Sequence, residues 1–216
     1  MQNVPLMTQS GEGTPDKPWI IKTILFGDYR SGRNTVWDRM TEDNYPLVPP
    51  GPLPQIGIDF KTLKFNDGCI KSQIWNAPRG GERMSHVPRG YYRGSHSAIL
   101  VVRTSMPNQL QRVTKDMAAF EESKDNPYRE YILVSNVDKT KPRQFTTEEA
   151  EQWATKHNMM FVEVDATEDV GPILIEKLKE ALDKVLLNID RFPKKLRANP
   201  VPAPGAPRLN NPCTLI

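Results

Sequence analysis

The chain has 216 residues, 38% of them hydrophobic, which is enough for one substantial core and too few for two. Its 29 lysine and arginine residues against 26 acidic residues leave a net charge of +3, too small to indicate a nucleic-acid partner. The two cysteines, Cys69 and Cys213, match no CxxC or Cys/His spacing, so neither a disulfide framework nor a zinc site is predicted. Because no apolar run suits a signal peptide or a membrane span, we expect neither secretion by that route nor spanning of a membrane.

Strand-length apolar runs alternate with helical patterns from residue 19 onward. Residues 1–18 are rich in Pro, Gly, Ser and Thr and are predicted to be disordered. Asp67-Gly68 between two apolar runs predicts an antiparallel hairpin, and continuous apolar runs at 97–102, 131–134 and 159–164 are typical of buried parallel strands. Helical spacing joins Leu110 to Phe120, Thr146 and Glu149 have capping-box spacing, and a last helix is predicted over about 172–189.

The first predicted strand runs directly into GDYRSGRNT, residues 27–35. This segment has the placement and glycine spacing of a phosphate-binding loop, GxxxxGK followed by Ser or Thr, whose backbone N–H groups surround phosphates at a helix start. Arg33 stands at the lysine position, and Asn34 stands where the magnesium-binding hydroxyl belongs. The loop alone leaves an ordinary strand-turn-helix connection open as an alternative.

Four further strings follow in the order and at nearly the intervals found in Rab proteins. They are IGIDF (56–60), KSQIW (71–75), GGER (80–83) and YYRGSHS (91–97). Over about residues 19–190 the chain therefore resembles a Rab-type small GTPase of the Ras superfamily. The resemblance implies the P-loop α/β fold, with a mostly parallel six-stranded sheet, one antiparallel edge hairpin and helices on both faces. It also implies GTP or GDP as ligand.

The departures from the family concentrate on magnesium and on catalysis. The family's magnesium-directed positions correspond to Asn34, Gln55 and Asn76, so that two hydroxyls and a carboxylate are replaced by uncharged amides. The water-orienting glutamine falls on Gly81, in a segment one residue longer than the family's WDTAGQER. We therefore expect Mg²⁺ binding to be weak or absent and hydrolysis absent or very weak, and we assign no catalytic residue.

The resemblance also carries guanine recognition over. The NKxD string aligns either with residues 135–138 or with Asn136 and Asp138 after a one-residue deletion, and both alignments stay open. Asp138 would accept the guanine N–H groups, while the backbone N–H of Ala166, in the position of the ETSAK alanine, would address the guanine carbonyl. The predicted nucleotide-binding residues are Gly27, Arg30, Gly32, Arg33, Asn34, Thr35, Asn136, Asp138 and Ala166.

Three arginines are candidates to offset phosphate charge in place of lysine and magnesium. Arg33 takes the lysine position, Arg30 lies within the loop, and Arg79 lies in the lengthened second switch. A guanidinium can bind phosphate through two N–H groups at once. The alternative is that Arg30 and Arg79 are simply solvated, as loop arginines commonly are.

The positions of the aromatic triad that Rabs present to their effectors hold Phe60, Trp75 and Tyr91. Large rings held on strands make good interface anchors, so these three are the predicted effector-binding residues. The alternative is that Phe60 and Trp75 only pack between hairpin and helix.

Residues 191–216 form a predicted flexible, proline-rich tail. The chain ends in Cys213-Thr214-Leu215-Ile216, which fits the CaaX prenylation motif, and Lys194, Lys195 and Arg197 could attract anionic lipid. We expect prenylation at Cys213 and a cytoplasmic protein held peripherally on the cytosolic face of a membrane.

Together these expectations describe a Rab-like pseudo-GTPase of vesicle traffic that binds Rab effectors or regulators with impaired magnesium-dependent GTP hydrolysis. A divergent but active GTPase with altered metal dependence and slow hydrolysis is the alternative. A structural module that keeps an empty pocket is a third.

Overall fold

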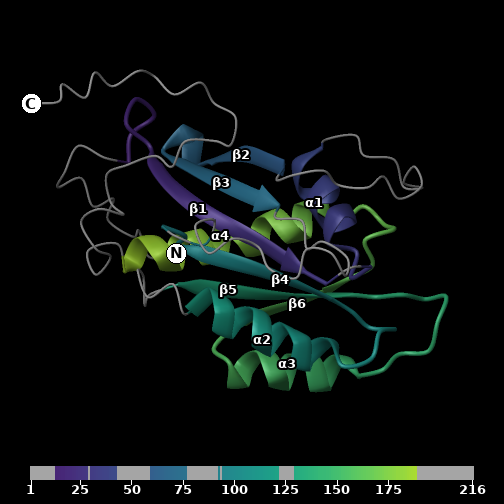
Figure 1. The fold of residues 1–216 in the computed structure, drawn as a ribbon. Helices are drawn as coiled ribbons and strands as arrows, with labels where there is room; N and C mark the ends of the chain where they lie inside the picture. The colour runs from purple at the N-terminus through teal and green to yellow at the C-terminus, as the bar shows by residue number, and fades with distance from the viewer. Residues whose placement is uncertain are drawn as a thin grey trace, which may run out of the picture.

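The computed structural model describes residues 13–28, 30–42, 59–76, 92, 94–121 and 129–188. Strands and helices alternate along most of this part of the chain (Figure 1). In order, the elements are β1 (Trp19–Gly27), α1 (Arg33–Thr41), β2 (Asp59–Phe65), the 3-10 turn η1 (Asn66–Gly68), β3 (Ile70–Asn76), β4 (Ser97–Arg103), α2 (Gln109–Glu121), β5 (Glu130–Asn136), α3 (Thr147–Lys156), β6 (Met160–Val164) and α4 (Gly171–Leu187).

The strands form one six-stranded sheet in the order β2-β3-β1-β4-β5-β6. The pairs β3-β1, β1-β4, β4-β5 and β5-β6 are parallel, whereas β2 pairs antiparallel with β3 at one edge. The predicted mostly parallel sheet with one antiparallel edge hairpin is confirmed. Asn66, Asp67 and Gly68 reverse the chain with φ values of 51°, 54° and 88°, a left-handed conformation that these three residue types tolerate best.

Helices cover both faces of the sheet and enclose two separate apolar cores. Figure 1 shows α2 and α3 together on one face, and α1 and α4 pack on the other. The predicted spacing on α2 is confirmed, because Val113, Met117 and Phe120 are buried against strand residues such as Leu100 and Leu133.

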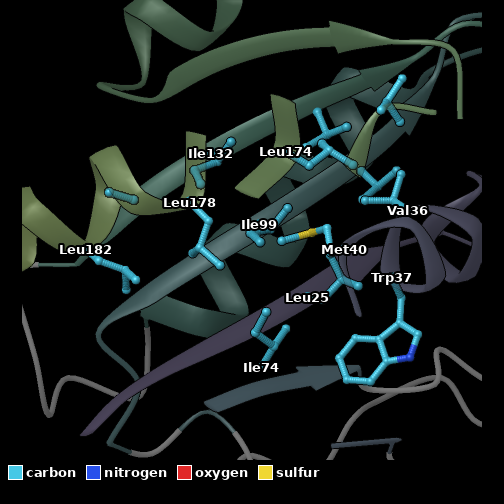
Figure 2. Packing of buried hydrophobic residues seen from close by; sticks show 14 of the residues in the cluster. Leu25, Val36, Trp37, Met40, Ile74, Ile99, Ile132, Leu174, Leu178 and Leu182 are labelled. Carbon is cyan, nitrogen blue, oxygen red and sulfur yellow. The ribbon is translucent and has the colours of Figure 1, made fainter. Parts of the chain in front are cut away.

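On the opposite face, α4 presents one buried stripe to the strands. Leu174, Leu178 and Leu182 recur every four residues and belong to one buried cluster with Ile99 and Ile132, all of which are labelled in the close view of this core (Figure 2). The predicted last helix over about 172–189 is therefore confirmed as α4, within one or two residues at each end.

The predicted capping box at the start of α3 is also present. The Glu149 backbone N–H donates to Thr146 Oγ1 at 3.1 Å, and the Thr146 N–H donates to Glu149 Oε2 at 2.7 Å. The two bonds satisfy donors that a helix start otherwise leaves unpaired, which fixes where the chain turns from the loop after β5 into α3.

The domain limits are described only in part. The first strand begins at Trp19 as expected, but residues 13–17, within the segment predicted to be disordered, form a turn in which Gly13 N donates to Lys17 O at 2.7 Å. The predicted tail, with Cys213, lies outside the described residues. Within the described ranges, no helix is long and apolar enough to cross a membrane.

Replacing Leu178 by alanine tests the α4 core. Its side chain is fully buried, so Leu178→Ala is expected to lower the free energy of unfolding by about 2–5 kcal/mol, since it removes apolar burial and leaves a cavity. Leu187→Ala, on the same helix but 69% exposed, is expected to change it by less than about 0.5 kcal/mol. Urea unfolding followed by tryptophan fluorescence measures both, and equal losses would contradict this packing.

Candidate nucleotide site

The predicted site residues gather at one edge of the sheet, where the parallel strands end. Gly27 is the last residue of β1, Asn136 is the last residue of β5, and Ala166 lies two residues beyond β6. Loops that follow the carboxyl ends of parallel strands meet at one edge, which is the usual ligand site of such sheets. Motifs that are far apart in the sequence therefore lie together at one edge of the sheet.

The phosphate-loop segment needs glycine at both predicted positions because other groups approach its backbone closely. A Cβ at Gly27 would lie 2.5 Å from Ser31 Oγ and 3.1 Å from the Val101 carbonyl oxygen. A Cβ at Gly32 would lie 1.9 Å from Asn136 Nδ2, and Gly32 has a φ of 85°. Arg30 also adopts a left-handed conformation, with a φ of 65°, so the loop curls tightly before α1.

The loop leads into the start of α1 in the manner of an anion site. Gly32 is the N-cap and has no side chain, so it offers no side-chain acceptor to the N–H groups of the first helical turn. The Arg33 N–H contacts Ser31 Oγ at 3.3 Å, and Thr35 follows half-buried in the same turn. A helix start of this kind favours a phosphate group through its N–H donors and its dipole.

Two of the three predicted magnesium positions meet, and they bind each other. Asn76 Nδ2 donates to Asn34 Oδ1 at 3.3 Å across 42 residues of sequence. The same oxygen accepts from Arg33 Nε at 3.3 Å and from Arg33 Nη2 at 3.1 Å. The side-chain oxygen of Asn34 therefore accepts from three N–H donors, and two of these belong to the positively charged guanidinium of Arg33.

This donor set does not fit a magnesium ion. Mg²⁺ prefers carboxylate, phosphate and water oxygens, whereas Asn76 turns an N–H donor toward Asn34 and the Arg33 guanidinium repels a cation. Among the described residues, no group of three or more His, Cys, Asp or Glu side chains could hold a metal. Gln55, Gly81 and Arg79 lie outside the described residues.

Asn136 joins the phosphate loop to the loop after β6. Its Nδ2 donates to the Ser31 carbonyl oxygen at 3.0 Å, and its Oδ1 accepts from the Ala166 backbone N–H at 3.2 Å. Both bonds are buried. Asn136 thus lies between two predicted nucleotide-binding loops, and both alignments of the NKxD string place it in that motif.

Arg39 is a connecting residue that sequence reasoning missed. From the buried face of α1, its Nε donates to the Ala166 carbonyl oxygen at 3.0 Å and its Nη2 to the Thr167 carbonyl oxygen at 3.3 Å. Its position in the sequence could have indicated this role, because a charged residue three positions after Val36 and beside Met40 lies on the apolar side of a short helix. Arg39 thus holds the loop after β6 against α1.

The Asp138 carboxylate is well supplied with donors. Oδ1 accepts from the Thr140 N–H at 3.0 Å and hydroxyl at 2.6 Å, and Oδ2 accepts from the Ser105 hydroxyl at 2.8 Å. Arg103 Nε lies 3.9 Å from Oδ2, and the Asp138 side chain is only 9% exposed. The Thr140 hydroxyl above all, with the other bonds and Arg103, lowers the pKa of Asp138 to about 2 despite burial.

Two of the three predicted effector-binding aromatics form a pair. Phe60 and Trp75 face each other across β2 and β3, with ring centroids 5.3 Å apart and planes at 78°. Phe60 is half-buried, but Trp75 is only 4% exposed, and Lys22 Nζ lies 4.4 Å from the centroid of its ring. Trp75 therefore belongs to the core, in agreement with the alternative interpretation that this residue packs inside the domain. Tyr91 lies outside the described residues.

The sheet order, the loop after β1 and the loops after β5 and β6 together define the α/β fold of small GTPases. The sequence matches the Ras family over residues 22–186, and the chain belongs to that family. Its relatives include the Ras-related protein Rab-11B of Dictyostelium discoideum, 28% identical over 71% of this chain and 69% of the relative.

Two further relatives are also Rab proteins. RABA2a of Arabidopsis thaliana is 27% identical over 84% of this chain and 81% of its own length. Human Rab-30 is 26% identical over 76% of this chain and 78% of its own length. At this level of identity the chain is a divergent Rab-type small GTPase, which confirms the resemblance found in the motifs.

Alanine at Gly32 tests the contact between the phosphate loop and Asn136. Gly68 provides the matched control, because its φ of 88° is nearly the same but its Cβ would meet nothing within 4 Å. Gly68→Ala is expected to lower the free energy of unfolding by about 1–2 kcal/mol through backbone strain alone. Gly32→Ala is expected to lower it by about 1–3 kcal/mol more through the clash.

Denaturant unfolding of both variants is then repeated with Asn136→Ala present. The additional loss at Gly32 should shrink in that background, while the loss at Gly68 should stay the same. A Gly32 penalty independent of residue 136 would contradict the close approach.

Proposed function

We propose that this protein is a Rab-like pseudo-GTPase of membrane traffic that binds Rab effectors or regulators and hydrolyses GTP weakly or not at all. The observation that carries the proposal is the direct hydrogen bond between Asn76 Nδ2 and Asn34 Oδ1 at 3.3 Å. Two side chains at metal-directed positions of the family are engaged with each other and with Arg33.

The charge arrangement supports weak or absent use of Mg²⁺. In phosphoryl transfer a bound metal neutralises charge that develops on the phosphate oxygens. At this site a guanidinium lies within hydrogen-bonding distance of the Asn34 oxygen, and the neutral amide of Asn76 stands where the family has a carboxylate. The positive charge of Arg33 can offset phosphate charge, and the glycine at position 81, where the family has its water-orienting glutamine, supplies no side chain for that role.

Binding of GTP or GDP remains part of the proposal, since relatives in this family include a GTP-binding protein, ypt3 of Schizosaccharomyces pombe. The close approaches at Gly27 and Gly32 and the start of α1, whose Gly32 N-cap has no side chain, support phosphate binding by backbone N–H groups. Arg30, exposed on this loop, and Arg33 are placed to add charge to those donors. We expect nucleotide to be held mainly through its phosphates.

Single-turnover GTP hydrolysis tests the loss of catalysis. The natural chain is expected to show no hydrolysis above background and GDP affinity that does not change when Mg²⁺ is exchanged for EDTA. The Asn34→Ser, Asn76→Asp variant, which returns a hydroxyl and a carboxylate, is expected to gain at least about tenfold dependence of GDP affinity on Mg²⁺. Asn188→Asp, at the end of α4, is the charge-matched control, and its GDP affinity should gain no dependence on Mg²⁺.

Hydrolysis by the natural chain at the rate of an unassisted Rab would reject the pseudo-enzyme proposal in favour of a divergent active GTPase. GDP affinity that collapses in EDTA would reject the proposed independence of Mg²⁺.

The proposed docking surface is the β2 edge of the sheet around Phe60. The ring of Phe60 lies against the buried Trp75, which holds it in place at little cost in side-chain entropy. The proposal thus assigns contact with the partner to Phe60 and support to Trp75, with Tyr91 as a third predicted contact. Prenylation of Cys213 would bring this surface to the cytosolic face of a membrane.

Removal of the Phe60 ring tests this surface. Phe60→Ala is expected to weaken capture by a panel of purified Rab effectors by about 2 kcal/mol or more where Phe60 is a central contact. Phe161→Ala is the control, because Phe161 is also half-buried on a strand but lies on β6, at the opposite edge of the sheet. Equal binding by the two variants, measured by surface plasmon resonance, would remove the β2 edge from the proposal.

A further inference from the structure

Recognition of guanine by a carboxylate requires acceptors that are still available. Guanine presents a ring N–H and an adjacent amino group, and an aspartate accepts one bond from each through its two oxygens. Each carboxylate oxygen has about two acceptor positions. Adenine lacks this pair of adjacent donors, so a carboxylate that can accept both bonds selects strongly for guanine.

The acceptor positions of Asp138 are largely taken by the protein itself. Oδ1 accepts two bonds from Thr140, from its backbone N–H and its hydroxyl, which fills that oxygen. Oδ2 accepts the Ser105 hydroxyl at 2.8 Å and faces Arg103 at 3.9 Å. Because Oδ1 is filled, a guanine base could bond to both oxygens only if Thr140 first released the carboxylate.

These partners come from two different parts of the fold. Arg103 ends β4 and Ser105 follows it, whereas Thr140 lies in the loop after β5. A further bond joins the same segments, because the Asp138 backbone N–H donates to Thr104 Oγ1 at 3.1 Å. Asp138 therefore ties the end of β4 to the loop after β5.

The second group expected to recognise guanine is engaged as well. The Ala166 N–H, which would address the guanine carbonyl, donates to Asn136 Oδ1 at 3.2 Å in a buried bond. The two loops that would flank the base are also joined, since Lys139 Nζ lies 3.0 Å from Asp165 Oδ2. The groups predicted to recognise the base are thus already bonded to other groups of the protein.

We propose that Asp138 is a structural residue joining β4 to the loop after β5, and that this site binds purine nucleoside phosphates without selecting guanine over adenine. The inference rests on the proposed function, because it concerns the base half of the same site. It is independent of the metal half, since no contact of Asp138 involves Asn34 or Asn76. Affinity would then come from the phosphates, which GDP and ADP share.

Fluorescent GDP, ADP and XDP analogues test the selectivity. The natural chain is expected to bind GDP and ADP within about tenfold of each other, because base contacts contribute little. XDP carries a carbonyl in place of the guanine amino group, so an amide at residue 138 that contacts the base would favour XDP. Asp138→Asn is expected to leave the ratio of GDP to XDP affinity unchanged. A large preference for GDP that Asp138→Asn turns into a preference for XDP would overturn the proposal.

Thermal unfolding without nucleotide tests the structural role separately from binding, and failure of all three nucleotides to bind would overturn the binding half of the proposal. Asp138→Asn and Ser105→Ala are each expected to lower Tm by at least about 3 °C, and the double variant by less than the sum. Asp169→Asn, an exposed carboxylate before α4, is the matched control and should leave Tm unchanged. An unchanged Tm in Asp138→Asn would overturn the proposal. Hydrolysis by the natural chain, in contrast, would reject the pseudo-enzyme and leave this inference standing.

Discussion

The buried side chain of Asn136 is the constraint on which the site depends. Its amide nitrogen holds the carbonyl of Ser31 and its oxygen holds the N–H of Ala166, so it fixes the distance between the phosphate loop and the loop after β6. Gly32 must be a glycine because this amide lies where its Cβ would be. Arg39 adds a second connection from α1 to Ala166, and together these bonds give the site its shape from protein contacts alone.

At the proposed nucleotide site, two positions predicted for metal are neutral, whereas one predicted for phosphate is positively charged. Asn34 and Asn76 are neutral and share a hydrogen bond, whereas Arg33 contributes a positive charge beside them. A positive group at a helix start strengthens attraction for anions and weakens it for cations. The positive charge therefore favours binding of a polyphosphate without a metal ion over binding of the same polyphosphate with one.

Local patterns in the sequence predicted most of the fold. The strand at Trp19, the buried face of α4, the capping box of Thr146 and Glu149 and the hairpin at Asp67 all depend on residues close together in the chain. The motif resemblance selected candidate residues that the fold brings together at one edge of the sheet.

The contacts that decide the chemistry could not be predicted in this way. Asn34 and Asn76 lie 42 residues apart, and Ser105 and Asp138 lie 33 apart. Each pair meets only because of the order of the strands, which no local pattern encodes. Burial of Trp75 depends on contacts with side chains of neighbouring strands, Phe60 on β2 and Lys22 on β1, and its spacing in the sequence left both outcomes open.

The bond between Asn34 and Asn76 couples the two positions energetically. A substitution that removes either amide breaks the shared hydrogen bond and also changes the surroundings of Arg33, whose guanidinium donates to Asn34 Oδ1. The effects of substitutions at positions 34 and 76 are therefore not expected to add, so the two residues act as one unit of the site.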